Sequence, residues 1–344
     1  MQTENRTLWF DNLRVIAVIG VIGIHVSSAG NGVTNTDYNF WVSNFFNSLS
    51  RFGVPVFVML SGALLLSKEE SIGEFLKKRL LRILFPFIFW SFAYITNSLI
   101  NDYNKGVNLN FEYIIQQIFI HFRDGSTPHF WYIYMIIGLY LFMPIIGKWI
   151  RNSSEKDILY FLVIWFIVLL INQPFISKIK PSIDFSYFSG YLGYLVLGHY
   201  LTIKPVENKT RVNLIAICLI FSGLSFTVLS TYIVQYFTIL PGGTFYNPLS
   251  INILIYSSGI FLWFRNKDIR YNFLISIRNV INKYSYGIFL VHIFILSKLD
   301  DFHIRWNFIN PLFGIPFTII VCLIISTGII FVISKFPLGK YISG

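Results

Sequence analysis

Long apolar runs, separated by short polar segments, recur along the whole 344-residue chain. Ten of them approach or exceed the length of about 20 residues that a helix needs to cross a bilayer. The predicted spans are 9–29, 44–67, 82–100, 129–147, 157–173, 186–203, 212–233, 248–264, 284–299 and 311–334. These runs are continuously apolar and do not alternate as the strands of a membrane barrel do. We therefore predict an all-α, polytopic membrane bundle of about ten transmembrane helices.

The distribution of basic residues gives this bundle an orientation. Cytoplasmic loops of membrane proteins carry an excess of Lys and Arg. With the N-terminus in the cytoplasm, the inner segments hold 19 of the 27 Lys and Arg residues and the outer loops hold 6. Both termini are therefore predicted to be cytoplasmic. No linker interrupts the chain, so residues 1–344 are predicted to form one domain in the cell membrane.

Composition agrees with a membrane protein and excludes several other classes. Hydrophobic residues make up 55% of the chain and charged residues only 12%, whereas soluble domains carry about 25% charged residues. The two cysteines, Cys218 and Cys322, lie in apolar runs and predict neither a disulfide framework nor a metal site. The net charge of +11 is spread over the loops, so no nucleic-acid partner is expected.

Three ionisable residues lie in the first predicted span, where burial of charge is costly and indicates function. Asp11 and Arg14 are one helical turn apart, and His25 follows Arg14 by eleven positions. Eleven residues make three turns plus about 20°, so both side chains lie on one face, about 16 Å apart along the axis. Alternatively, Arg14 extends to the interface and pairs with Asp11, while His25 makes a packing hydrogen bond.

Five segments resemble motifs of the acyltransferase-3 family of integral membrane acyltransferases. The first is Asp11-Asn12-Leu13-Arg14 with His25, in which Asn12 replaces the Gly of many relatives. The others are 53–62, which ends in Ser-Gly, the basic segment 75–86, the His-Phe-Trp-Tyr at 129–132, and 285–292. The resemblance covers most of the chain and implies a stand-alone member, similar to the O-acetyltransferases of surface polysaccharides.

The resemblance implies transfer of an acyl group, usually acetyl, from cytoplasmic acyl-CoA to a hydroxyl of an extracytoplasmic or lipid-linked glycan. No permanently bound cofactor is expected. We interpret Arg14, Arg79 and Arg82 as the residues that bind the nucleotide end of acyl-CoA, with Asp11 as electrostatic support. His25 is the predicted catalytic residue, either as a general base or as a covalent acyl carrier. The alternative for Arg79 and Arg82 is ordinary cytoplasmic charge.

Further residues are candidates for binding the acceptor. They are Arg51, His129, Trp131 and His292. The alternatives are an interfacial position for Arg51, an interface anchor for His129 and a packing hydrogen bond for His292. His199 and His303 are interpreted as structural.

Two other functions remain compatible with ten spans and buried charges. One is a transporter or flippase of a polysaccharide precursor, and the other is a noncatalytic membrane partner of a polysaccharide assembly complex.

Overall fold

The computed structural model describes residues 2–32, 37–174, 176, 190–238, 240–267 and 272–344, with side chains left out for 2–7, 31–32 and 272–274. Within these ranges the chain forms helices, turns and loops, and no strand. The α-helices are α1 (Gln2–Ser28), α2 (Tyr38–Ser50), α3 (Gly53–Leu65), α4 (Ile72–Asn104), α5 (Phe111–Asp124), α6 (Trp131–Arg151), α7 (Glu155–Ile171), α8 (Leu192–Ile203), α9 (Lys209–Phe237), α10 (Ile251–Arg265), α11 (Asn272–Asp301), α12 (Pro311–Ile333) and α13 (Gly339–Ile342). The prediction of an all-α fold is confirmed.

Seven of the described helical segments are long and apolar enough to cross a membrane. They are Leu8–Ser28, Tyr38–Leu65 (α2 and α3 together), Ile72–Asn104, Trp131–Arg151, Lys209–Phe237, Ile275–Asp301 and Pro311–Ile333. The other three predicted spans correspond to α7, α8 and α10, which have 17, 12 and 15 residues. The predicted span 186–203 begins outside the described residues. The protein is thus a multi-pass helical membrane protein, and a count of ten spans stays a prediction.

Two predicted surface segments are continuous with membrane helices. The amphipathic pattern of the inner stretches 71–80 and 270–282 predicts helices that lie along the cytoplasmic surface, but α4 runs unbroken over Ile72–Asn104 and α11 over Asn272–Asp301. Ser71 caps the start of α4 by accepting a hydrogen bond from the Glu74 backbone N–H at 3.3 Å. In each case one helix carries both the charged first turns and the apolar run, and α4 continues through Pro86.

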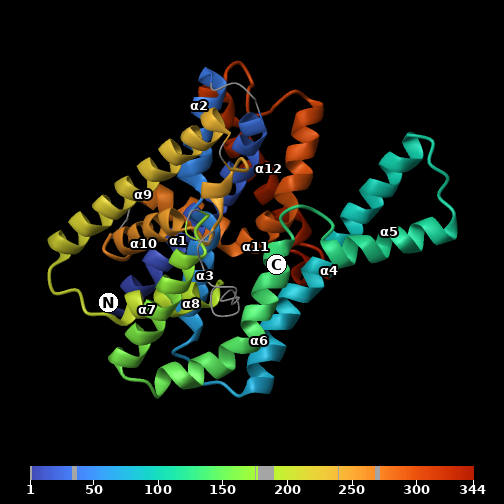
Figure 1. The fold of residues 1–344 in the computed structure, drawn as a ribbon. Helices are drawn as coiled ribbons and strands as arrows, with labels where there is room; N and C mark the ends of the chain where they lie inside the picture. Colours follow the sequence, from blue (N-terminus) through green and yellow to red (C-terminus); the bar gives the residue numbers. More distant parts are fainter. Residues whose placement is uncertain (1, 33–36, 175, 177–189, 239, 268–271) are drawn as a thin grey trace.

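The long connection expected at 101–127 contains a helix of its own. The span boundaries make this segment one of the two longest connections predicted on the outer side, and α5 occupies Phe111–Asp124 within it. Figure 1 shows α5 and the end of α4 projecting from the body of the molecule as a pair. Asn110 caps α5 by accepting from the Tyr113 backbone N–H at 2.8 Å. The short polar segment between the two helices therefore acts as a turn.

Helix α1 occupies the centre of the bundle (Figure 1). It packs against α2, α3, α10, α11 and α12. Its buried residues Leu13 and Ala17 belong to one hydrophobic cluster, and Val18 and Ile22 belong to a second. A Cβ atom at Gly20 would lie 3.0 Å from the Ser50 carbonyl oxygen, so glycine permits close contact with the α2–α3 junction. The helix that carries Asp11, Arg14 and His25 is therefore surrounded by other helices of the bundle.

Four segments predicted to be cytoplasmic are joined by hydrogen bonds at one end of the bundle. Arg151, at the end of α6, donates to the Lys68 carbonyl at 2.8 Å. Glu155, at the start of α7, pairs with Lys204, whose carbonyl in turn accepts from Arg265. These contacts bring together the loops that contain Lys68, Arg151, Lys204 and Arg265. A cytoplasmic position for this end stays a prediction.

Candidate functional site

Three of the six histidines in the sequence meet inside the bundle. His25 lies near the end of α1, His129 lies in the turn before α6, and His292 lies in α11. Their ring centroids are 6.0 Å (His25–His129), 5.2 Å (His25–His292) and 4.7 Å (His129–His292) apart. His129 and His292 are 2% and 0% exposed. We call these three residues the histidine cluster.

Two members of the histidine cluster are oriented by hydrogen bonds. Nδ1 of His292 lies 2.6 Å from the carbonyl oxygen of Phe289, and Nδ1 of His129 lies 2.7 Å from Oγ1 of Thr127. The described residues include no group of His, Cys, Asp and Glu side chains arranged to hold a metal ion. Imidazole nitrogens can accept a proton or attack a carbonyl carbon, so the histidine cluster is suited to proton transfer or nucleophilic attack.

A cavity of about 250 Å³ lies toward the N-terminal end of α1 and contains all three predicted donor-binding arginines. Arg14 of α1 lines it together with Arg79 and Arg82 of α4. Polar groups on its wall are also supplied by Ser61 and Tyr140. Arg82 is exposed and Arg79 half-buried, so these charges extend from solvent into the cavity. We call this space the arginine cavity.

Arg14 is held by two residues on two helices. Its guanidinium donates to Oδ1 of Asn282 at 2.5 Å and lies 3.8 Å from the Asp11 carboxylate. Asn282 Nδ2 also donates to Asp11 at 2.8 Å. Asp11 thus contacts both Arg14 and the asparagine that binds it. Sequence reasoning found Asp11 and Arg14, which are neighbours on one helix, and missed Asn282.

One face of α11 connects the arginine cavity to the histidine cluster. Asn282, Ser285, Tyr286 and Phe289 line the cavity, and His292 belongs to the cluster. Their spacing of i, i+3, i+4, i+7 and i+10 is that of a single helical face. This periodicity of polar and aromatic residues, ending at a histidine, is the signal in the sequence that could have identified Asn282.

Phe289 forms the boundary between the cavity and the cluster. Its ring lies 5.1 Å from that of His129 and 5.8 Å from that of His292. Tyr132 of α6, which also lines the cavity, lies 5.2 Å from Phe289. The cavity therefore ends against an aromatic side chain that contacts two of the three histidines.

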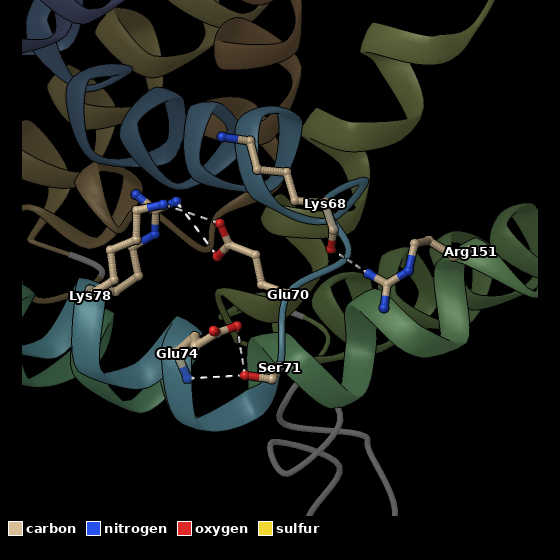
Figure 2. A network of polar contacts seen from close by, with 7 residues as sticks. Lys68, Glu70, Ser71, Glu74, Lys78 and Arg151 are labelled. Carbon is tan, nitrogen blue, oxygen red and sulfur yellow. Dashed lines mark hydrogen bonds and ion pairs between the residues drawn. The ribbon is translucent and has the colours of Figure 1, made fainter.

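The loop before α4 places Glu70 beside Lys78 (Figure 2). Glu70 also pairs with Arg79, which lines the arginine cavity. The carboxylate of Glu70 lies 3.3 Å from Lys78 and 3.9 Å from Arg79. Arg151 holds this loop through the carbonyl of Lys68 at 2.8 Å. Lys78 is 62% exposed, whereas Arg79 is 17% exposed, so the pair with Arg79 is the better shielded from solvent.

The two remaining residues predicted to bind the acceptor, Arg51 and Trp131, do not belong to the histidine cluster. Arg51 donates to Asn47 at 2.7 Å and to the Tyr246 carbonyl at 3.3 Å, and its guanidinium stacks 4.2 Å above the Tyr246 ring. Trp131 is 41% exposed and lies 5.8 Å from Tyr191. Of the four residues predicted to bind the acceptor, the structure brings His129 and His292 to His25.

Comparison with known proteins adds the family. Residues 7–330 match the acyltransferase domain that defines the acyltransferase-3 family. The chain belongs to the acyltransferase-3 family. It is also similar to the nodulation protein NolL of Sinorhizobium fredii (strain NBRC 101917 / NGR234), at 23% identity over 200 residues. That match covers 56% of this chain and 49% of NolL, so the chain spans about half the length of this relative. No solved structure matches the chain.

The acyltransferase therefore combines two elements of chemistry in one bundle. The arginine cavity supplies guanidinium groups, which bind phosphates well because of their charge and forked geometry. The histidine cluster supplies groups that accept protons or attack a carbonyl. Helix α1 carries residues of both, Arg14 in the cavity and His25 in the cluster.

Proposed function

We propose that this acyltransferase moves an acyl group, with acetyl as the expected one, from cytoplasmic acyl-CoA to a hydroxyl of an extracytoplasmic or lipid-linked glycan. The observation that carries the proposal is the arginine cavity, whose Phe289 wall contacts two members of the histidine cluster. In this proposal the chain has ten spans, both termini face the cytoplasm, and the protein lies in the cell membrane.

The size of the cavity supports a division of the donor into two parts. Pockets that enclose a whole drug-sized ligand measure about 300–1,000 Å³, and the arginine cavity measures about 250 Å³. The pantetheine arm and acyl group are therefore the parts that enter. The phosphates of the nucleotide stay at the exposed side of the cavity, where Arg82 and Arg79 lie. Arg14 lies on the wall of the same cavity and binds the part of the nucleotide end that reaches farther in.

His25 is proposed as the catalytic residue that meets the thioester. It lies about 16 Å along α1 from Arg14, a distance comparable to an extended pantetheine arm. Its ring is 5.2 Å from that of the fully buried His292, in a part of the bundle where burial disfavours the charged ring. A neutral imidazole has the lone pair that either catalytic role requires.

Arg51, His129, Trp131 and His292 are proposed to surround the acceptor. Arg51 lies in contact with Tyr246, in the segment joining α9 to α10. This segment lies at the opposite end of the bundle from the Arg151–Lys68 contact, because α9 runs from one end to the other. The acceptor is accordingly expected to approach from the extracytoplasmic side.

The test is transfer by the purified protein in liposomes, supplied with labelled acetyl-CoA and cell-envelope glycan. We expect label to appear on the glycan with the native protein and to be absent with His25→Ala. His199→Ala, a buried histidine bonded to Ser67 outside the cluster, is the control and should transfer normally. Full transfer by His25→Ala would refute the catalytic assignment. Movement of unmodified glycan across the bilayer, without loss of label from the donor, would instead identify a flippase.

A further inference from the structure

The hydrogen bond of His292 determines which of its ring nitrogens is basic. A carbonyl oxygen only accepts hydrogen bonds, so the Nδ1 atom 2.6 Å from the Phe289 oxygen must carry a hydrogen. In the neutral ring, Nε2 then holds the lone pair. His292 is thus a base through Nε2.

That basic atom is buried and has no hydrogen-bond partner among the described residues. Buried polar atoms without partners are rare and destabilising, so each needs an explanation. His292 is 0% exposed, and its ring lies 5.2 Å from that of His25. An unsatisfied acceptor at this position is explained if it receives a proton from a substrate during the reaction.

Two other contacts hold His292 in place. Tyr94 of α4 donates its hydroxyl hydrogen to the Leu290 carbonyl at 2.9 Å and accepts from the Phe294 backbone N–H at 3.1 Å. These backbone groups flank His292 on either side in the sequence. The histidine is therefore fixed through its own ring and through the helix that carries it.

We infer that the two histidines divide the reaction, with His25 carrying the acyl group and His292 taking the proton of the acceptor hydroxyl. The inference rests on the proposed function. A single imidazole cannot hold the acyl group and act as the base that removes it, whereas two neighbouring rings can. Nε2 of His129 is likewise buried without a hydrogen-bond partner among the described residues. Its Nδ1 partner is the Thr127 hydroxyl, which can donate or accept, so its basic nitrogen is not determined and we assign His129 no step.

The steps balance as follows. A ring nitrogen of neutral His25 forms a bond to the thioester carbonyl carbon, the carbon–sulfur bond breaks, and the CoA thiolate leaves with the electron pair. His25 is then a cationic acyl-imidazolium. The acceptor oxygen attacks the acyl carbon while Nε2 of His292 takes the hydroxyl proton, and the carbon–nitrogen bond breaks to regenerate neutral His25. His292 finally releases its proton to solvent.

The experiment separates the two steps by using labelled acetyl-CoA first without and then with cell-envelope glycan. We expect covalent label on the native protein, discharged by the glycan and by hydroxylamine, a strong nucleophile that needs no general base. His292→Gln should acquire the same label, keep it in the presence of glycan, and lose it to hydroxylamine. Its glycan transfer should fall at least about 100-fold, the usual minimum contribution of a general base. His25→Gln should acquire no label.

Several results would overturn the inference while leaving the proposed function intact. One is glycan transfer by a native protein that never carries covalent label. Another is transfer by His292→Gln within about threefold of native, well short of a general-base contribution. His292→Asn is the second variant at this position, and His199→Gln is the control for replacing a buried histidine. If both His292 variants remain folded and neither acquires covalent label, the assignment of His292 to the second step fails. Absence of any transfer or donor cleavage by the native protein would instead refute the proposed function, and the inference with it.

Discussion

The carboxylate of Glu70 lies 3.9 Å from the guanidinium of Arg79, a residue that lines the arginine cavity of the acyltransferase. The pair places a negative charge beside one of the three arginines proposed to bind the donor. A phosphate that binds Arg79 must compete with this carboxylate. Removing the Glu70 charge therefore tests whether the arginine cavity binds an anionic donor.

We predict that Glu70→Gln lowers the KM for acyl-CoA by about twofold to fivefold, as expected for an ion pair worth up to about 1 kcal/mol. The kcat should change little, because Glu70 pairs with Lys78 and Arg79 on the side proposed to bind the donor. The measurement is initial transfer rate against donor concentration. Glu74→Gln, in the first turn of α4, where the carboxylate accepts a hydrogen bond from the Ser71 hydroxyl, is the control and should leave KM unchanged. An increased KM for Glu70→Gln would show that the carboxylate orients Arg79 instead.

Asn282 is predicted to matter for donor binding through Arg14. Asn282→Ala removes the hydrogen bond to the Arg14 guanidinium and leaves Asp11 without the Nδ2 donor. Hydrogen bonds to charged groups contribute about 1.5–3 kcal/mol, so the KM for acyl-CoA should rise about tenfold or more. The KM for the acceptor should stay constant. Lys283→Ala, at the neighbouring exposed position, serves as control; equal KM values for the two variants would contradict the role of Asn282.

Tyr94 is predicted to act on the histidine cluster and not on donor binding. Tyr94→Phe keeps the ring but removes the hydroxyl that joins Leu290 to Phe294. Loss of a buried hydrogen bond of about 1–3 kcal/mol should lower kcat about tenfold by loosening His292, with the donor KM unchanged. Steady-state kinetics measures both values. Tyr160→Phe, on the exposed side of α7, is the control variant. If Tyr94→Phe and Tyr160→Phe have the same kcat, the Tyr94 hydroxyl is dispensable.

Close packing of α3 on α8 is predicted to limit stability. A Cβ atom at Gly198 would overlap the Met59 carbonyl, so Gly198→Ala must displace one helix and should cost about 1–3 kcal/mol. Gly138→Ala, where the new Cβ would meet no atom within 4 Å, should be neutral or stabilising because Ala favours helix. Thermal unfolding in detergent compares the two. A lower melting temperature for Gly138→Ala than for Gly198→Ala would contradict this packing.

Features that depend on neighbouring residues were predictable from the sequence. The apolar runs gave the helical class, and the spacing of Arg14 and His25 predicted a shared face. In the structure both contact α11, through Asn282 and His292 respectively. Likewise, Arg79 and Arg82, three positions apart, line the same cavity.

Features that depend on distant packing were not predictable from one sequence. His129 follows His25 by about a hundred positions, and nothing in either local pattern indicates that their rings lie 6.0 Å apart. The exact length of α4 was also missed, because charged residues in its first turns resembled a separate surface helix. Nothing in the sequence pattern indicated a role for Glu70, because its position beside Arg79 depends on how the loop before α4 folds.

The position of Arg14 and His25 on a single straight element has a consequence for how the chain can vary. Inserting one residue between them would rotate the imidazole by about 100° relative to the guanidinium, away from α11. Inserting four would restore its orientation but shift it by about 6 Å along the axis. The eleven-residue interval thus sets both the distance and the relative direction of these two side chains along α1, and loops elsewhere can change length without altering either.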